Sequence, residues 1–375
     1  MVRAFLLLFI IASVVACSSR NLRPGFQSQQ DVLQRAWNYS ILPLSSGNHP
    51  GGIEYVSPVI QENTLIFGSS RAGLISFYPE IKRKKWSFPV ENGVVSQIGV
   101  HNGQVFFTGG DGKLYSVSGE NGKTLWTYDL RNPVTSAPAI KGEDLYIVTS
   151  DDVLLSLEQK TGKWQWQYRR RNVSGPVIHG ATKPLVLAES VWVGFADGSL
   201  VALSRKDGKV LWEKQLNSSK RFSGLNAELM ESEGLVFVPA YDQALYALNP
   251  KTANPVWVRD ELGGSKRVTA ADGVLYVPTS QGKVHAVDVK TGKDLWSFEL
   301  DAGVPSGIVV TERHVLFAST HEYLYALERL SGKLVYRHQV GYDSGFSGGL
   351  AFDPVKRMLF GLSRGGNLYS FRYLR

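Results

Sequence analysis

The chain has 375 residues, of which 43% are hydrophobic, and its formal net charge is +8 at pH 7. This length suggests two or more domains, but a repeat that continues through most of the chain favours one. Because Cys17 is the only cysteine, an internal disulfide is excluded and packing alone must stabilise the fold.

Residues 1–16 have the form of an export signal. A charged start precedes an apolar run from Ala4 to Ala16, which is too short to cross a bilayer as a helix. The run ends in Val-Val-Ala-Cys17, which resembles a bacterial lipobox with Val in place of the commoner Leu. The pattern predicts cleavage before Cys17 and acylation of Cys17, and several acyl chains together anchor a protein stably. The alternative is an ordinary signal peptide with an incidental cysteine.

The residue after Cys17 indicates the membrane to which the lipoprotein would be sorted. Ser18 rather than Asp follows Cys17, which by the usual bacterial sorting rule predicts the outer membrane of a Gram-negative bacterium, with the protein facing the periplasm. Residues 17–35 are mostly polar, and we interpret them as the lipidated cysteine and a flexible tether.

A recurring turn and aromatic residue organise residues 36–375. The turn ends in Gly-Lys and an aromatic residue follows three positions later, as in Gly122-Lys123-Thr124-Leu125-Trp126. These anchor residues lie 39 to 49 positions apart, at Trp37, Trp86, Trp126, Trp166, Trp212, Trp257, Trp296 and Tyr336. A period of about 40 residues is typical of a propeller or a repeat array. The middle intervals, ending at Trp212 and Trp257, are lengthened, which predicts extra loop residues there.

Each repeat also contains a β-hairpin signal. In the second repeat, Gln104–Thr108 and Lys113–Val117 flank the Asp111-Gly112 turn. One strand before the hairpin and the Trp-bearing strand after it complete a four-stranded blade. The last hairpin, Met358–Leu362 with Asn367–Phe371, lacks a Trp strand, whereas the strand at Trp37 lacks a blade before it. The sequence therefore predicts an all-β, eight-bladed β-propeller of antiparallel blades over residues 36–375, closed by pairing of the N-terminal strand with the last blade.

Two basic runs, at residues 82–85 and 169–171, account for much of the clustered charge. Such runs are typical of nucleic-acid binding, but an exported lipoprotein rarely meets nucleic acid, so we expect no nucleic-acid partner. Anionic lipid headgroups, an acidic partner surface and simple solvated loops remain as interpretations.

The chain shows no catalytic or metal-binding motif. Its seven histidines lack metal-ligand spacing, and the acidic residues are scattered singly in turns. The one adjacent pair of aspartates, Asp151-Asp152, lies at a predicted hairpin turn. We therefore expect no enzyme, no metal and no cofactor.

The Gly-Lys-x-x-Trp repeats resemble those of quinoprotein dehydrogenases, many of which carry a vicinal disulfide that one cysteine cannot form. With the lipobox, the tether and eight repeats, the chain more fully resembles the BamB family of outer-membrane lipoproteins. Residues 69–74 look like that family's first-blade hairpin, and residues 134–138 resemble a later strand opening. The resemblance implies a non-catalytic scaffold of the BAM complex, which inserts β-barrel proteins into the membrane. Its partner would be the BamA-like barrel-assembly subunit, bound through periplasmic POTRA domains.

The resemblance also implies which residues bind the partner. By matching position, the family's two binding segments correspond to Ile178-His179 and to residues 221–226, in which Arg221, Phe222, Leu225 and Asn226 are the candidate contacts. The family's Arg is replaced by His179, and its two Asp positions by Gly224 and Asn226. Since interfaces depend on complementary charge, either the partner surface differs from the usual one or the partner is not the usual one.

Two other functions fit parts of this pattern. One is a periplasm-facing propeller that binds another envelope partner or cell-wall glycan, and the other is a degenerate quinoprotein dehydrogenase.

Overall fold

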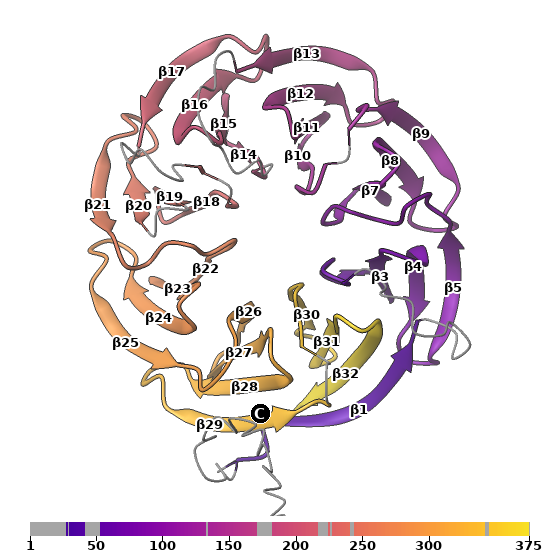
Figure 1. The fold of residues 1–375 in the computed structure, drawn as a ribbon, viewed down its shortest axis with the longest axis vertical. Coiled ribbons are helices and arrows are strands. Elements are labelled where there is room, and N and C mark those ends of the chain that lie inside the picture. Colours follow the sequence, from indigo (N-terminus) through magenta and orange to yellow (C-terminus); the bar gives the residue numbers. More distant parts are fainter. Residues whose placement is uncertain are drawn as a thin grey trace, which may run out of the picture.

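The computed structural model describes residues 28, 30–41, 53–132, 134–170, 182–216, 224–225, 227–240, 244–341 and 345–374. Within these residues the strands form eight antiparallel sheets of four strands each, and no helix occurs. The sheets stand around a central axis as the blades of a propeller (Figure 1). The predicted fold class and number of blades are confirmed.

The blades follow one another in chain order, each from its innermost to its outermost strand. Blade 1 consists of β2 (Val59–Gln61), β3 (Thr64–Ser69), β4 (Gly73–Tyr78) and β5 (Arg83–Phe88). Blade 2 consists of β6 (Gly99–His101), β7 (Gln104–Thr108), β8 (Lys113–Ser118) and β9 (Thr124–Asp129). Blade 3 consists of β10 (Ala139–Lys141), β11 (Asp144–Val148), β12 (Val153–Glu158) and β13 (Trp164–Arg169). Blade 4 consists of β14 (Leu185–Val186), β15 (Ser190–Gly194), β16 (Ser199–Ser204) and β17 (Val210–Gln215).

The second half repeats this order. Blade 5 consists of β18 (Met230–Ser232), β19 (Leu235–Pro239), β20 (Leu245–Leu248) and β21 (Pro255–Arg259). Blade 6 consists of β22 (Thr269–Ala271), β23 (Val274–Pro278), β24 (Lys283–Asp288) and β25 (Asp294–Glu299). Blade 7 consists of β26 (Pro305–Val310), β27 (His314–Ser319), β28 (Tyr323–Glu328) and β29 (Leu334–Gln339). Blade 8 consists of β30 (Leu350–Asp353), β31 (Met358–Leu362), β32 (Asn367–Tyr373) and, from the other end of the chain, β1 (Leu33–Ser40).

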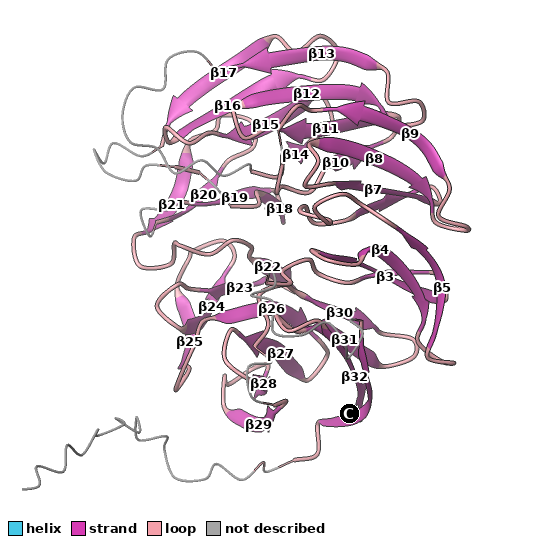
Figure 2. Ribbon diagram, turned by 45° about the vertical axis from the view of Figure 1, so that its right-hand side comes forward, coloured by secondary structure: helices cyan, strands magenta, loops and turns pink. Residues whose placement is uncertain are grey.

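Strand alternation within a blade defines two faces of the ring. Because neighbouring strands are antiparallel, the turns between first and second strands and between third and fourth strands lie on one face, the turn face. The turns between second and third strands share the opposite face, the connection face, with the links from each outer strand to the next blade. Figure 2 shows the ring obliquely.

The core consists of the interfaces between blades, where the anchor aromatics lie. Trp126 Nε1 donates a hydrogen bond of 3.1 Å to the Gln159 carbonyl oxygen of the next blade. Gly162, in the Gly-Lys turn of that blade, lies against the indole so closely that a Cβ there would be 2.5 Å from Trp126 Cε3. The same pair of contacts recurs at Trp86, Trp166, Trp257 and Trp296. The Gly-Lys turn and the Trp of adjacent repeats are therefore one packing unit.

Pairing of β1 with β32 closes the ring, as the sequence predicted. The propeller begins earlier than the predicted boundary at residue 36, because β1 starts at Leu33 and Val32 is fully buried. Val32 and Leu33 pack in one hydrophobic cluster with Val335 and Tyr336 of blade 7. No helix among the described residues is long and apolar enough to cross a membrane.

Candidate partner-binding surface

The predicted site residues Ile178, His179, Arg221, Phe222 and Asn226 lie outside the described residues, as does Cys17. Their flanking residues fix where the two candidate segments join the ring. The first segment links β13 of blade 3 to β14 of blade 4, and the second links β17 of blade 4 to β18 of blade 5. Both links run from an outer strand to the next blade, so both join the ring at its connection face.

A buried threonine holds the ends of the two segments together. The Thr182 hydroxyl contacts the Gly194 carbonyl oxygen at 2.9 Å and also donates to the Leu225 carbonyl oxygen. The Leu225 N–H in turn donates to the Phe195 carbonyl oxygen at 3.0 Å. The turn that follows β15 is thus the support that both segments share.

Leu225 is the one predicted contact residue that the structure describes, and it faces inward. Its side chain has no exposed surface and packs with Trp192 and Leu229 in the cluster between blades 4 and 5. A Cβ on Gly194 would lie 2.5 Å from Leu225 Cβ, so only glycine permits this approach. The expectation that Leu225 touches a partner is therefore corrected: it fixes the end of the second segment from inside the core.

A charged cluster marks the end of blade 3 where the first segment begins. The Arg170 guanidinium lies 2.8 Å from an Asp197 carboxylate oxygen and 2.6 Å from a Glu213 oxygen. Burial alone would raise the pKa of Asp197, but hydrogen bonds from Ser199 and the Arg170 charge hold it below its ordinary value. Burial would lower the pKa of Arg170, but the hydrogen bonds that it donates to Glu213, Tyr168 and Asp197 raise it above its ordinary value. The cluster joins blades 3 and 4 at the site.

The basic run at 169–171 is therefore partly neutralised within the fold. Arg169 also pairs, with Asp151 at 3.2 Å, although both side chains are exposed. Asp151 and Asp152 lie in the turn between β11 and β12, as predicted. The sequence analysis did not predict the ion pairs of Arg170. The only signal for them was the acidic residue of the Asp197-Gly198 turn, with which a cation of the preceding blade could pair.

The interface between blades 4 and 5 departs from the five interfaces in which a turn glycine packs on the Trp. Where five repeats place glycine, this turn has Ala253, fully buried with φ of 54°. Its methyl group excludes an indole at the usual place, and Trp212 instead packs edge-to-face on Trp192 with ring centroids 4.5 Å apart. The second candidate segment links the two blades of this interface.

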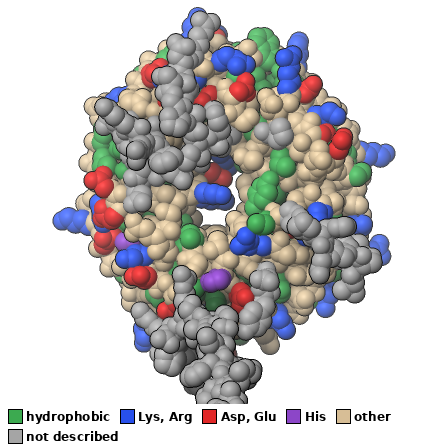
Figure 3. Space-filling view, viewed as in Figure 1, with side chains coloured by type: hydrophobic (Ala, Val, Ile, Leu, Met, Phe, Trp, Pro, Cys, Tyr) green, Lys and Arg blue, Asp and Glu red, His purple; other side chains and the backbone are tan. Residues whose placement is uncertain are grey.

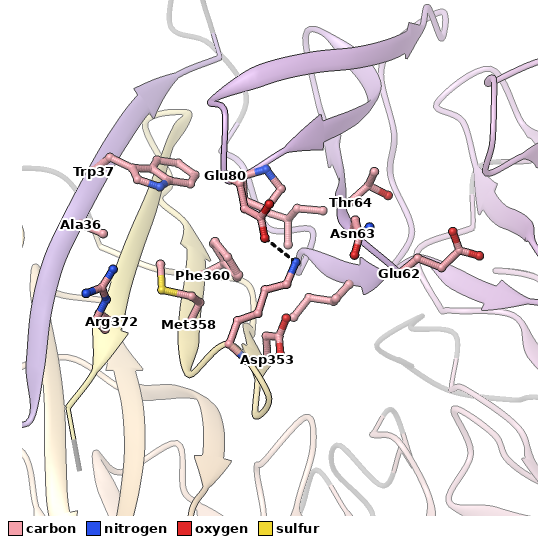
Figure 4. A pocket seen from close by; sticks show the side chains of 14 residues that line it. Ala36, Trp37, Glu62, Asn63, Thr64, Glu80, Asp353, Met358, Phe360 and Arg372 are labelled. Carbon is pink, nitrogen blue, oxygen red and sulfur yellow. Dashed lines mark hydrogen bonds and ion pairs between the residues drawn. The ribbon is translucent and has the colours of Figure 1, made fainter.

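A cavity lies at the closure between blades 8 and 1. There Lys82, with φ of 52°, takes the place of the glycine that would cover Trp37. The cavity has a volume of about 460 Å³. Trp37, Met358 and Phe360 line it from blade 8, and Asn63, Thr64 and Glu80 from blade 1 (Figure 4).

The side chains that the structure describes do not form a metal-binding cluster. No three His, Cys, Asp or Glu side chains gather closely enough in this part of the chain to hold a metal ion. Figure 3 shows an opening at the centre of the ring, edged by hydrophobic and charged side chains. The metal and the vicinal disulfide of a quinoprotein site therefore do not fit the residues that the structure describes.

Comparisons with known proteins agree on the fold. The family model described as outer membrane protein assembly factor BamB matches residues 37–298 and 280–351. The crystal structure of BamB from Moraxella catarrhalis superimposes with a TM-score of 0.73 at 19% identity, covering 91% of this chain and 100% of that one. Quinohemoprotein alcohol dehydrogenase from Comamonas testosteroni also superimposes with a TM-score of 0.73, at 13% identity, covering 92% of this chain and 77% of that one. No curated protein sequence matches the chain.

Proposed function

The chain belongs to the BamB family of outer membrane protein assembly factors, and we propose that it is a non-catalytic scaffold lipoprotein of the machinery that assembles outer-membrane β-barrel proteins. The match of the family model to residues 37–298 and 280–351 carries this proposal. The likeness to dehydrogenases has only 13% identity and concerns the propeller fold that both share.

The anchor in this proposal is Cys17. Cleavage after Ala16 leaves Cys17 as an acylated first residue in the outer membrane, with the propeller in the periplasm. Several acyl chains give a stable anchor where one is marginal.

The partner in this proposal is a BamA-like subunit, bound through its POTRA domains on the connection face. Phe222 supplies an apolar anchor, and Arg221 with His179 supplies positive charge, while Ile178 extends the apolar contact. Interfaces depend on a few such anchors set among complementary charges. The Thr182 bonds and the Arg170 cluster support the proposal, because they hold the ends of both segments rigidly before binding.

A binding measurement tests this proposal. The acylated chain in detergent is titrated into purified POTRA domains of the BamA-like subunit from the same organism, and titration calorimetry measures the affinity. The double variant Arg221→Glu with Phe222→Ala should weaken binding at least about 30-fold, as expected for removal of central anchor residues.

A matched control changes the same kinds of side chain elsewhere. Lys206→Glu with Leu211→Ala alters an exposed cation and an exposed leucine of blade 4, away from the connection face. This control should bind as the wild type does. Unchanged binding by the Arg221 and Phe222 variant would show that the carried-over interface is wrong.

A further inference from the structure

The three most exposed large apolar side chains among the described residues lie in one sector of the turn face. Leu330 is 94% exposed, Val355 89% and Ile81 65%. They occupy turns of the consecutive blades 7, 8 and 1. An ion pair of 2.7 Å between Glu80 and Lys356, drawn in Figure 4, joins the residues next to Ile81 and Val355.

Two of these residues replace polar ones at equivalent positions of other repeats. Leu330, six residues before Tyr336, stands where blades 3 to 6 have Lys160, Lys206, Lys251 and Lys290. Ile81, five residues before Trp86, stands where the other repeats place Asn, Thr, Asp or Ser. Packing does not explain either exchange, because both side chains point to solvent. Exposed apolar residues gathered in one sector indicate an interaction surface.

The same sector is basic. We define the blade 7–8–1 surface as the turn residues around these three side chains, namely 31–35, 61–64, 78–85, 310–314, 328–333, 353–358 and 372–374. These ranges contain eleven Lys and Arg residues and six Asp and Glu residues. Exposed cations at Lys82, Arg83, Lys84 and Arg357 flank the apolar side chains. Apolar groups rimmed by cations suit a bilayer with anionic headgroups.

Ser28, the first described residue of the chain, lies against the outer strand of blade 7. The Ser28 hydroxyl bonds to the Arg337 carbonyl oxygen of β29. Arg337 lies in the middle of β29, about 10 Å from Leu334 at the turn face and about 7 Å from Gln339 at the connection face. Eleven residues separate Cys17 from Ser28, and so many residues span at most about 40 Å. An anchor at Cys17 therefore keeps blade 7 within that distance of the bilayer.

We propose that the blade 7–8–1 surface docks on the anionic surface of the membrane that holds the anchor. The proposal rests on acylation of Cys17, which is part of the proposed function. Ile81, Leu330 and Val355 enter the interfacial region, and the flanking cations contact lipid phosphates. This docking orients the connection face, with its two candidate segments, away from the bilayer and toward the periplasm.

Quenching by labelled lipids tests the docking. The full acylated chain is placed in vesicles of phosphatidylethanolamine and phosphatidylglycerol that carry headgroup nitroxides. A fluorophore on Glu312→Cys reports the blade 7–8–1 surface, and one on Ser280→Cys reports the connection face; both parent residues are exposed. Acylated Cys17 does not react with the label. Quenching should be at least about threefold stronger at position 312 than at position 280.

Variants then separate docking from simple tethering. Changing Ile81, Leu330 and Val355 together to Ser should reduce quenching at position 312 to the level at position 280. The matched control changes Leu125, Leu211 and Leu295 to Ser, since these outer-strand leucines are 47%, 55% and 55% exposed. It should leave quenching unchanged, whereas replacing phosphatidylglycerol by phosphatidylcholine should weaken it at least twofold.

The outcomes distinguish the two proposals. Acylated protein that floats with vesicles but shows equal quenching at both positions overturns the docking alone, and an acidic protein then becomes the favoured partner of this surface. Quenching at position 312 that survives the triple variant also overturns the docking. A chain that is not acylated and does not float overturns the anchor and the docking together.

Discussion

The Tyr336 hydroxyl donates a hydrogen bond of 2.8 Å to the carbonyl oxygen of Leu33, 303 residues earlier in the chain. This contact explains why the last anchor is tyrosine rather than tryptophan. Blade 8 has no Gly-Lys turn, because its outer strand comes from the other end of the chain, so no glycine covers the ring of residue 336. Val32 and Leu33 take that place, and a longer side chain with a terminal hydroxyl reaches their backbone.

Tyr336→Phe tests this closure. Burial raises the pKa of Tyr336 to about 12, so the hydroxyl remains a donor at neutral pH. Its removal leaves a buried carbonyl without that partner, and we expect unfolding to become easier by roughly 1–2 kcal/mol. Urea denaturation measures the change. Tyr39→Phe, at a side chain 37% exposed, should change stability by less than about 0.5 kcal/mol; equal losses would contradict the role of the bond.

Substitutions at the glycine position of the turn test its packing on the Trp of the preceding blade. Gly292→Ala places a Cβ 2.7 Å from the Trp257 indole at φ of 68°, so we expect a loss of at least about 2 kcal/mol. Ala253→Gly should change stability by less than about 1 kcal/mol, because relief of the left-handed conformation offsets the lost methyl contact. Thermal and urea denaturation compare the two variants. A similar loss in both would show that Ala253 does not substitute for the common glycine.

Asp197→Asn tests the charged cluster at the candidate surface. Because the folded pKa of Asp197 lies below the unfolded value, its contribution is complete above the unfolded pKa and is lost as pH falls through the folded pKa. We expect Asp197→Asn to cost roughly 2 kcal/mol at pH 7 and progressively less below about pH 4. Unfolding free energies between pH 3 and pH 7 give the profile. A difference that is constant with pH would contradict the ion pair with Arg170.

Cys17→Ser tests the anchor. Without the thiol no acyl chain can be attached, so the variant should incorporate no radioactive palmitate and should leave the membrane fraction. Labelling of growing cells followed by membrane fractionation measures both effects. Wild-type protein without label would indicate an ordinary signal peptide.

The fold followed from the sequence because its repeats carry the contacts that define it. Each Gly-Lys turn packs on the Trp of the preceding blade, so the spacing of those residues gave the number of blades and the closure. The sequence alone places residues 32–33 in the tether, because two apolar residues among polar neighbours show no periodicity. Their burial depends on a partner, Tyr336, at the far end of the chain.

The candidate site was harder to predict from the sequence than the fold. Matching by position located two long links, but position within a link does not say which side chain faces inward. Leu225 is buried because Gly194 allows its close approach. The Arg170 cluster was missed because its acids come from the following blade. Leu330 and Ile81 depart from the repeat pattern in the sequence itself. That they lie in one sector of the turn face becomes clear only from the order of the blades around the ring.

The scaffold role is tested most directly by affinity capture of the tagged, acylated chain from detergent-solubilised membranes, followed by mass spectrometry of the proteins that copurify. The account predicts recovery of a POTRA-bearing outer-membrane barrel protein, and loss of that protein with the Arg221→Glu, Phe222→Ala variant. Consistent recovery of a different envelope complex, with no POTRA-bearing protein, would contradict it.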